Sequence, residues 1–314
     1  MEKIEALKLE VAKAVVGQTK MIDGLLIGLL TGGHILIEGV PGLAKTTTVN
    51  ALAKALGLDF KRAQFTPDLL PADIIGAEIY DPHENSFKIK HGPIFTNLLL
   101  ADEINRPPAK VQSALLEVMQ EKQVTIGDES FKLDLPFFVM ATQNPVEQEG
   151  VYQLPEAQLD RFMLKLVVGY NTKEEELEIA RRISSGVQEE VQSVITLDDL
   201  NTMKSDVLKI HMDEEIEKYI VDIIEATRSP KEFGLENLTD YLQFGASPRA
   251  TIDLFRASRA MAYLRGKDYV SPVDVAYVVK DILRHRIILS YEAEAEDITA
   301  DFIIDSIIKQ IPIP

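Results

Sequence analysis

Residues 38–47 constrain the fold of this chain more than any other segment. They read Glu-Gly-Val-Pro-Gly-Leu-Ala-Lys-Thr-Thr, follow the apolar run 35–37 and precede the helix-forming segment 49–56. This order predicts a strand, a glycine-containing loop and a helix. The first N–H groups of a helix have no partner within it, and the helix dipole is positive there. The loop should therefore attract phosphate.

The spacing in this loop is that of the P-loop, G-x-x-x-x-G-K-[ST], except that Ala44 stands where the second glycine is expected. In this pattern Lys45 reaches the β- and γ-phosphates and the Thr46 hydroxyl holds Mg²⁺. Alanine lacks glycine's free access to positive φ, so the backbone at Ala44 is either ordinary or strained. The residues predicted to bind nucleotide here are Gly39, Val40, Pro41, Gly42, Leu43, Ala44, Lys45, Thr46 and Thr47.

Length, composition and charge narrow the class of protein. The 314 residues are enough for two domains, and the lack of cysteine excludes disulfides and thiolate metal sites. A net charge of −17 argues against tight, sequence-independent DNA binding, which needs a basic face. The N-terminus is charged and has no signal-peptide apolar region, and the apolar stretch 21–40 is interrupted by polar residues. We therefore expect a cytoplasmic protein.

The pattern of predicted secondary structure changes near Gly169, where we place a domain boundary. Residues 1–169 alternate short apolar strands with helices, as in a parallel sheet covered on both faces, and 170–314 read as helices. Polar turns within 79–89 and 123–133 predict two β-hairpin inserts. The expected strands are 35–38, 98–101, 137–142 and 163–168, and the expected later helices are 173–184, 214–227, 248–264, 272–289 and 300–310.

A second motif begins at the apolar run 98–101, which ends in Asp102 and Glu103. Asp102 would complete the Mg²⁺ shell, because Mg²⁺ prefers hard oxygen ligands. Glu103 would polarise the water that attacks the γ-phosphate. Two acids after an apolar run are common by themselves. Downstream of a P-loop they indicate nucleotide hydrolysis.

Three further residues are candidates for contacting phosphate. Asn144 ends an apolar strand and could orient water or bind the γ-phosphate, although Asn-Pro is also an ordinary turn signal. Arg161 could bind phosphate oxygens, or could form a surface ion pair with Asp160 or Glu156. Arg249 lies at a helix start, where its charge opposes the helix dipole, which suggests that it binds an external anion.

Taken together, these motifs resemble those of AAA+ ATPases, and most closely the MoxR family, over nearly the whole chain. The similar segments are 38–46, where that family often has alanine at the sixth position, together with 64–71 and 102–106. The implied fold is an α/β P-loop AAA+ core with a parallel sheet, followed by an all-α lid. The hairpins resemble the helix-2 and pre-sensor-1 inserts of related proteins.

The resemblance also implies a role for each site residue. Lys45 and Thr46 correspond to Walker A, and Asp102 and Glu103 to Walker B. Asn144 corresponds to sensor 1, Arg161 to an arginine finger offered to a neighbouring subunit, with Arg106 as an alternative, and Arg249 to sensor 2. Gly17 and Gln18 belong to a segment expected near the adenine.

The function implied by the resemblance is Mg²⁺-dependent hydrolysis of ATP to ADP and phosphate by a ring, expected to be a hexamer. Its role would be chaperone-like, in the maturation, assembly or metal loading of a partner protein complex, and the client could contain a von Willebrand factor A domain. A nucleic-acid-remodelling motor is the alternative, favoured locally only by residues 87–91. A non-hydrolysing nucleotide-gated scaffold is a third class.

Overall fold

The structure is a computed structural model that describes residues 2–40, 42–145, 151–186 and 189–314. The chain divides into two compact units. Unit 1 contains residues up to Leu25, His34–Arg161 and Leu166–Leu200, and unit 2 contains Leu26–Gly33, Phe162–Lys165 and Asn201–Pro314. No helix within the described ranges combines the length and apolar character needed to span a bilayer. The sequence-based boundary near Gly169 stays a prediction.

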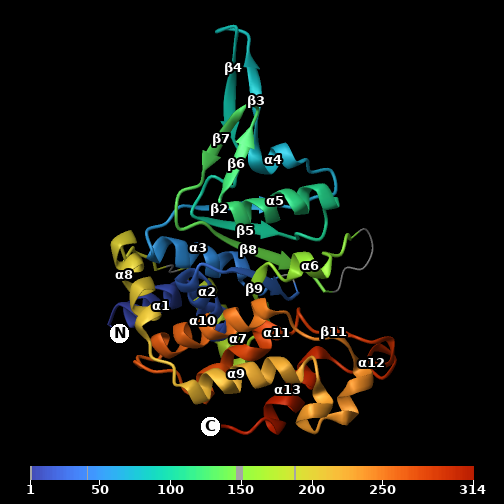
Figure 1. The fold of residues 1–314 in the computed structure, drawn as a ribbon. Coiled ribbons are helices and arrows are strands. Elements are labelled where there is room, and N and C mark those ends of the chain that lie inside the picture. Colours follow the sequence, from blue (N-terminus) through green and yellow to red (C-terminus); the bar gives the residue numbers. More distant parts are fainter. Residues whose placement is uncertain (1, 41, 146–150, 187–188) are drawn as a thin grey trace. The chain divides into compact units, whose positions relative to one another are not determined.

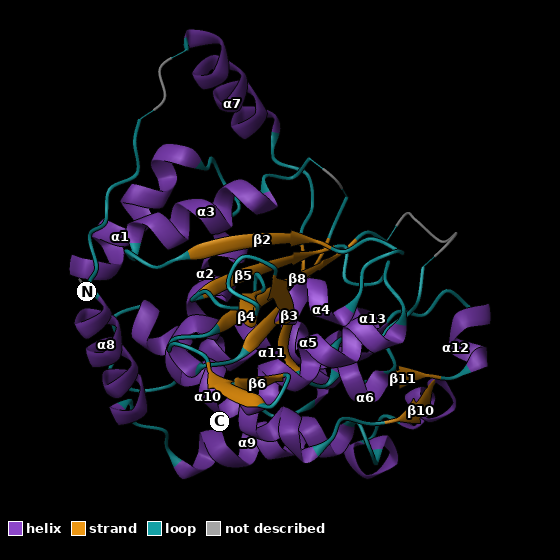
Figure 2. Ribbon diagram, turned by 90° about the horizontal axis from the view of Figure 1, so that it is seen from above, coloured by secondary structure: helices purple, strands orange, loops and turns teal. Residues whose placement is uncertain are grey.

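The main sheet has five strands within the described residues, in the order β2-β5-β8-β1-β9. The pairs β2–β5, β5–β8 and β8–β1 are parallel. Strands β2, β5 and β8 lie side by side in Figure 2. The bounds are β1 His34–Glu38, β2 Phe60–Gln64, β5 Leu98–Asp102, β8 Phe138–Gln143 and β9 Phe162–Val167. The four strands predicted from apolar runs are present. β2 was missed, because in its sequence Phe-Lys-Arg-Ala-Gln only Ala63 is buried.

The first two-thirds of the chain also contain helices α1 to α8. Helix α3 begins at Lys45, directly after the glycine-containing loop, as the sequence predicts. Helix α7 begins with a capping box in which Thr172 and Glu175 bond each other's backbone N–H groups. The bounds are α1 Glu2–Ala14, α2 Thr19–Thr31, α3 Lys45–Ala55, α4 Pro71–Ile75, α5 Ala109–Glu121, α6 Glu156–Leu159, α7 Lys173–Ser185 and α8 Leu197–Lys209.

Both predicted hairpins are present and extend from unit 1 (Figure 1). The first pairs β3 (Gly76–Asp81) with β4 (Ser86–His91), and the second pairs β6 (Gln123–Ile126) with β7 (Glu129–Lys132). An aromatic cluster joins them. The rings of His91 and Phe95 stack with centroids 3.8 Å apart, and Phe131 packs edge-on against His91 at 5.2 Å. The two hairpins therefore share an aromatic contact.

The remaining helices belong to unit 2. Their bounds are α9 Glu214–Ala226, α10 Pro248–Leu264, α11 Pro272–Leu283, α12 Tyr291–Ala295 and α13 Ala300–Gln310, with 3-10 helices at Pro230–Phe233 and Glu236–Tyr241. The predicted helix from Pro272 to Leu289 is too long, because α11 stops at Leu283. Residues Ile288–Leu289 form strand β11, which pairs with β10 (Leu242–Phe244). The apolar pattern that continues past Leu283 predicted more helix, but the pairing of β11 with the distant strand β10 makes residues 288–289 extended instead.

His34 fixes the start of β1. Its ring is buried, its Nδ1 accepts the N–H of Val139 at 3.0 Å, and its Nε2 donates to the carbonyl oxygen of Met119 at 3.1 Å. Burial disfavours the charged ring and lowers the pKa of His34 from 6.5 to about 4. The unfolded chain therefore binds a proton between these two pH values while the folded chain does not, and folding stability falls as the pH drops through this range.

We expect His34→Gln to lower the free energy of unfolding at pH 7.5 but to remove this acid sensitivity. Between pH 7.5 and 5, wild type should lose about 2 kcal/mol more than the variant. Urea unfolding of both proteins at the two pH values measures this difference. The buried His285, whose pKa is also lowered, remains in both proteins and cancels. If wild type and variant differed in free energy of unfolding by the same amount at both pH values, the acid sensitivity could not be assigned to His34.

Candidate active site

The carboxyl ends of three buried strands meet at one edge of the sheet. β1 ends at Glu38 and enters the glycine-containing loop, β5 ends at Asp102, and β8 ends one residue before Asn144. β8 lies between β5 and β1, with Ala141 beside Ala101 of β5 and Gln143 beside Glu38. The register therefore gathers the loop, the acids and Asn144 at the edge where open α/β sheets bind ligands.

The loop between β1 and α3 has the features of a phosphate cradle. A Cβ placed on Gly42 would meet no atom within 4 Å, so the space in front of the loop is open. Lys45 Nζ donates to the carbonyl oxygen of Gly39 at 2.7 Å. Burial lowers the pKa of Lys45, and the nearby charges of Asp102 and Glu103 oppose that shift. Of the predicted loop residues, Pro41 lies outside the described residues.

Ala44 has a left-handed backbone, with φ 53° and ψ 19°. The sequence left open whether this alanine would be ordinary or strained, and it is strained. An L-residue in this conformation costs about 1–2 kcal/mol relative to the right-handed form. Ala44 is the N-cap of α3, so the strain lies where the backbone turns into the helix N-terminus. Such strain persists only where surrounding structure enforces it, which is common at functional sites.

Thr142 organises the two acids from the neighbouring strand β8. Its hydroxyl donates to Asp102 Oδ1 at 2.5 Å and accepts the backbone N–H of Glu103 at 2.9 Å. Glu103 itself has φ 61°, so its backbone is also left-handed. One hydroxyl thus holds the Asp102 carboxylate and the turn at Glu103 in fixed relation. Sequence reasoning missed Thr142, because it reads only as a polar residue at a strand end.

The two acids also have partners from β2 and from the turn after β5. Arg62 Nη2 donates to Asp102 Oδ2 at 2.6 Å, and the Gln64 amide donates to Glu103 Oε2 at 2.8 Å. Arg106 Nε lies 3.1 Å from the same Glu103 oxygen. These contacts orient both carboxylates while they remain partly exposed. Arg62 was not among the predicted residues, because β2 was not recognised as a strand.

The donor atoms at this edge suit a magnesium–nucleotide complex. Asp102 offers a carboxylate and Thr46 a hydroxyl in the first turn of α3, both partly exposed, and such hard oxygens are what Mg²⁺ prefers. Thr47, also exposed, belongs to the same helical turn. The loop N–H groups and the ammonium of Lys45 suit phosphate oxygens.

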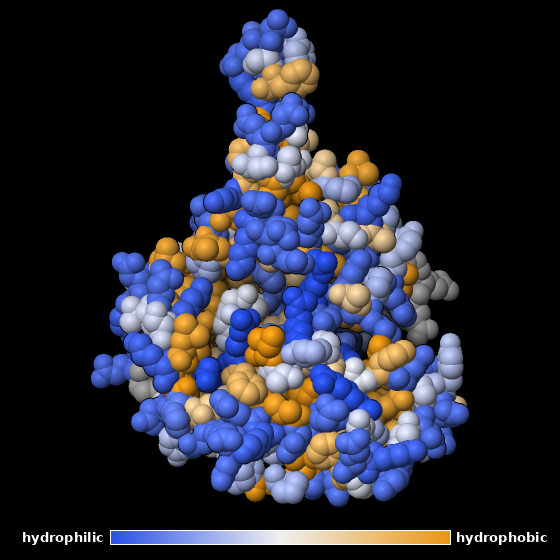
Figure 3. Space-filling model, viewed as in Figure 1, coloured by the Kyte–Doolittle hydropathy of each residue, from blue (hydrophilic) through white to orange (hydrophobic). Residues whose placement is uncertain are grey.

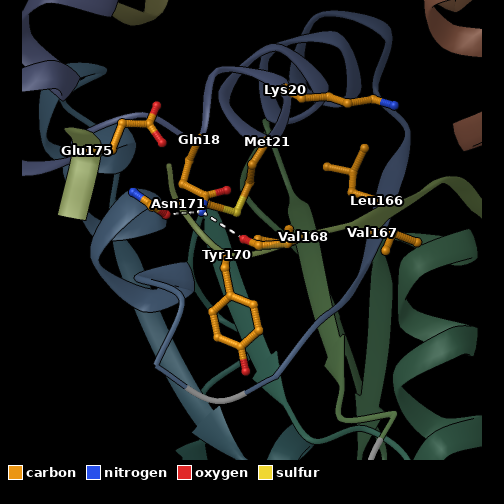
Figure 4. A pocket seen from close by; sticks show the side chains of 10 residues that line it. Gln18, Lys20, Met21, Leu166, Val167, Val168, Tyr170, Asn171 and Glu175 are labelled. Carbon is orange, nitrogen blue, oxygen red and sulfur yellow. Dashed lines mark hydrogen bonds between the residues drawn. The ribbon is translucent and has the colours of Figure 1, made fainter. Parts of the chain in front are cut away.

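A pocket beside the loop is lined by the segment predicted to lie near an adenine (Figure 4). Gln18 Nε2 donates to Asn171 Oδ1 at 2.7 Å, and Asn171 Nδ2 donates to the carbonyl oxygen of Val16 at 3.1 Å. Gly17 has φ 71°, and a Cβ there would lie 2.4 Å from Glu175 Oε1. Val168, which also lines the pocket, hydrogen-bonds Glu38 at the start of the loop. One wall of the pocket is therefore hydrogen-bonded to the residue at which β1 enters the loop.

Of the remaining predicted residues, Asn144 lies at this edge, whereas Arg161 and Arg249 belong to other parts of the chain. Asn144 is buried, directly after β8. Arg161 follows the short helix α6, and its Nη1 donates to the carbonyl oxygen of Leu116 at 3.0 Å. Arg249 is exposed in the first turn of α10 in unit 2. The geometry thus groups Lys45, Asp102, Glu103 and Asn144, and describes Arg249 only within its own unit.

Comparison with known proteins agrees with this geometry. Residues 34–164 match the ATPase family associated with various cellular activities (AAA), and residues 237–307 match the AAA lid domain. Chaperone MoxR1 of Mycobacterium tuberculosis is 46% identical over 97% of this chain and 81% of its own length. Protein MoxR of Paracoccus denitrificans is 32% identical over 96% of this chain and 93% of its own.

A solved structure supports the same assignment. The crystal structure of a candidate ATPase from Cytophaga hutchinsonii has a TM-score of 0.94 and 55% identity, covering 100% of this chain and 95% of that one. The P-loop, the parallel sheet and the helical C-terminal region are therefore those of a nucleotide-hydrolysing machine. The chain belongs to the MoxR family of AAA+ ATPases.

Proposed function

We propose that the chain binds Mg²⁺-ATP at the carboxyl edge of β1, β5 and β8 and hydrolyses it in a ring. The observation that carries the proposal is the meeting of Lys45, Asp102, Glu103 and Asn144 at this edge. Residues 39–47 hold the phosphates, Gly17 and Gln18 lie beside the adenine, and Thr46 and Asp102 are the magnesium ligands. When bound, Mg²⁺ offsets phosphate charge.

Glu103 is the residue that orients and polarises the attacking water. Gln64 and Thr142 hold its side chain and backbone, so little reorganisation is needed when water arrives. Asn144 contributes an amide toward the γ-phosphate, and Lys45 stabilises charge on the phosphate oxygens. Positioning and electrostatic stabilisation account for most catalysis of phosphoryl transfer, and these residues supply both.

The site is completed in trans by Arg161 from a neighbouring subunit of a hexameric ring. Both arginines contact their own chain, but Arg106 is paired with the Glu103 carboxylate, whereas Arg161 Nη1 bonds the backbone carbonyl of Leu116, and we therefore prefer Arg161. Arg249 acts as sensor 2 on the lid, which we place at residues 170–314, after the nucleotide domain at 1–169. A planar, permanently charged guanidinium suits both roles.

The client is a protein, and the role is chaperone-like maturation, assembly or metal loading of a partner complex. The name of the MoxR1 relative supports this class of activity. The hairpin β3–β4 exposes Ile79, Tyr80 and Phe87, of which Phe87 is 70% exposed. Figure 3 shows an apolar patch near the end of the projection, among hydrophilic side chains. Exposed apolar side chains on a projecting element suit contact with a protein. A von Willebrand factor A domain is the proposed client type.

A nucleic-acid motor is the less favoured function. Lys88, in the segment that favoured it, lies 2.8 Å from Asp81 and 2.6 Å from Glu84, so much of its charge is balanced within the hairpin. We expect no salt-sensitive retention of single- or double-stranded DNA in filter binding across a salt series. Tight retention of DNA that weakens steeply with salt would make a nucleic-acid motor the favoured function.

Glu103→Gln should retain ATP binding and lose hydrolysis by about 10²–10⁴-fold, because the amide cannot polarise water. Arg161→Ala should lose about 10³–10⁵-fold, as expected for a transition-state arginine. Mixing the two variants should restore turnover, because some interfaces then combine an intact Glu103 with an intact Arg161. Phosphate release from the mixture, compared with each variant alone, measures the recovery.

The mixing experiment needs proof that subunits exchange. A tag on one variant, with co-purification of the other, provides it. Mixed rings that show no more turnover than the separate variants would count against Arg161 acting in trans. Glu103→Gln with wild-type turnover would count against the site itself.

Ala44→Val should weaken binding of ADP with Mg²⁺ by about tenfold or more. A β-branched residue resists positive φ, so the free loop would relax and the nucleotide would have to restore the strained form. Ala44→Gly, the matched control, should bind at least as well as wild type. Calorimetry gives the affinities, and thermal unfolding checks the fold. Equal affinities for the valine and glycine variants would show that the left-handed backbone at residue 44 is not needed for binding.

A further inference from the structure

Side chains of the chain itself use most of the acceptor positions on the Asp102 carboxylate. Its Oδ1 accepts the Thr142 hydroxyl at 2.5 Å, and its Oδ2 accepts both Nε and Nη2 of Arg62, at 3.1 Å and 2.6 Å. A carboxylate offers about four lone-pair positions, two on each oxygen. One guanidinium therefore takes up the oxygen of Asp102 that Thr142 does not use.

Strand β2 and Gln64 place Arg62 on this oxygen. Gln64 lies beside Asp102 in the register of β2 with β5, and Arg62 stands two residues earlier, on the same face of the strand. The side-chain oxygen of Gln64 accepts Arg62 Nη2 at 2.8 Å, which turns the guanidinium toward Asp102. The Arg62 side chain is 49% exposed and that of Asp102 is 16% exposed. The arginine can therefore leave the carboxylate toward solvent without disturbing packed side chains.

This arrangement sets Arg62 against a metal ion at the same carboxylate. The proposed function makes Asp102 a ligand of Mg²⁺. A metal ion, or a water molecule of its hydration shell, needs acceptor positions of the kind that Arg62 occupies. The guanidinium and the metal ion also repel each other because both are positively charged. Binding of a metal ion at Asp102 is therefore opposed by Arg62.

The other charges near Asp102 add to this opposition. Arg106 Nε lies 3.1 Å from a carboxylate oxygen of Glu103. Burial lowers the pKa of Lys45, and the charges of Asp102 and Glu103 oppose that shift, so Lys45 belongs to the same group of charges. Among these four side chains and Arg62, the cations outnumber the acids. The group therefore favours an anion over a free metal ion, and the phosphates of a nucleotide would reverse that balance.

We propose that Arg62 excludes free Mg²⁺ from Asp102 and yields the carboxylate only when a bound nucleotide supplies negative charge. Arg62 thereby couples the binding of the metal to the binding of the nucleotide, because each favours the arrangement that accepts the other. This inference rests on the proposed role of Asp102 as a magnesium ligand. It assigns to Arg62 the order in which the site takes up its two ligands.

Arg62→Gln tests the inference, because glutamine removes the positive charge at a half-exposed position of β2. We expect the nucleotide-free variant to bind Mn²⁺ about tenfold more tightly than wild type, which is the size of one hydrogen bond to a charged group. Mn²⁺ is the probe because it suits the same oxygen ligands as Mg²⁺. The free ion has an electron paramagnetic resonance signal that is lost on binding, so a titration followed by this signal measures the affinity.

The same variant should bind ATP about threefold more weakly in the presence of EDTA, because one cation fewer attracts the phosphates when no metal ion is available. Calorimetry measures this affinity. The two effects have opposite signs, since the metal alone binds more tightly and the nucleotide alone binds more weakly. A residue that only maintained the local structure would weaken both. Weaker binding of both probes by Arg62→Gln would therefore overturn the inference.

Two matched variants separate the charge of Arg62 from other effects of the substitution. Lys61→Gln removes the same charge from the adjacent exposed residue of β2, whose side chain lies on the other face of the strand. It should match wild type in Mn²⁺ affinity. Arg62→Lys retains the positive charge and should stay within about threefold of wild type. If Arg62→Gln binds Mn²⁺ no more tightly than Lys61→Gln, the inference is wrong.

Asp102→Asn distinguishes this inference from the proposed function. Combined with Arg62→Gln, it should abolish the gain in Mn²⁺ affinity, because that gain comes from the carboxylate. A gain that persisted in the double variant would place the metal elsewhere and overturn the inference. In the presence of ATP, Asp102→Asn alone should weaken Mn²⁺ binding by about tenfold. An unchanged affinity there would remove Asp102 as a magnesium ligand, and this inference with it.

Discussion

The site depends on the parallel register of three buried strands. β1, β5 and β8 are buried along almost their whole lengths, so these strands have no solvent-exposed face onto which they could slip. Moving β5 by one residue would reverse the sides on which Asp102 and Ala101 point. Because the register holds, the polar residues that end each strand arrive at the same edge. The composition of the candidate site therefore depends on the positions at which the three buried strands end.

Backbone strain is found within the candidate site. Gln18, Ala44 and Glu103, with φ values of 54°, 53° and 61°, are three of the six non-glycine residues with positive φ in the described part of the chain. Such conformations are unfavourable for side-chain-bearing residues and persist only when neighbours enforce them. Thr142 does so for Glu103, and helix α3 does so for Ala44. Because the sheet is rigid, it can hold the loops at its edge in backbone conformations that the same loops would not keep in isolation.

The features of this structure that could be predicted are those encoded by residues close together in the sequence. The loop at 38–47, the acids after 98–101 and the polar turns of both hairpins are each readable within about ten residues. Thr142 and Arg62 could not be found in this way, because their roles depend on which strands are neighbours. The end of α11 at Leu283 was missed for the same reason, since the β10–β11 pairing is non-local.

Any attraction of the site for a nucleotide must come from nearby groups, because the net charge of the whole chain repels anions. A net charge of −17 opposes the approach of a nucleotide, and screening weakens this opposition only beyond about 8–10 Å. Near the loop the balance is different. Asp102 lies against Arg62, Glu103 lies against Arg106, and Lys45 Nζ bonds the neutral carbonyl of Gly39. With each acid next to a cation, the loop N–H groups, the N-terminus of α3 and Lys45 can present a positive field to phosphate. In the proposed function, the partners of the two acids therefore serve binding as well as orientation, because they keep the two carboxylates from cancelling the field that would attract phosphate.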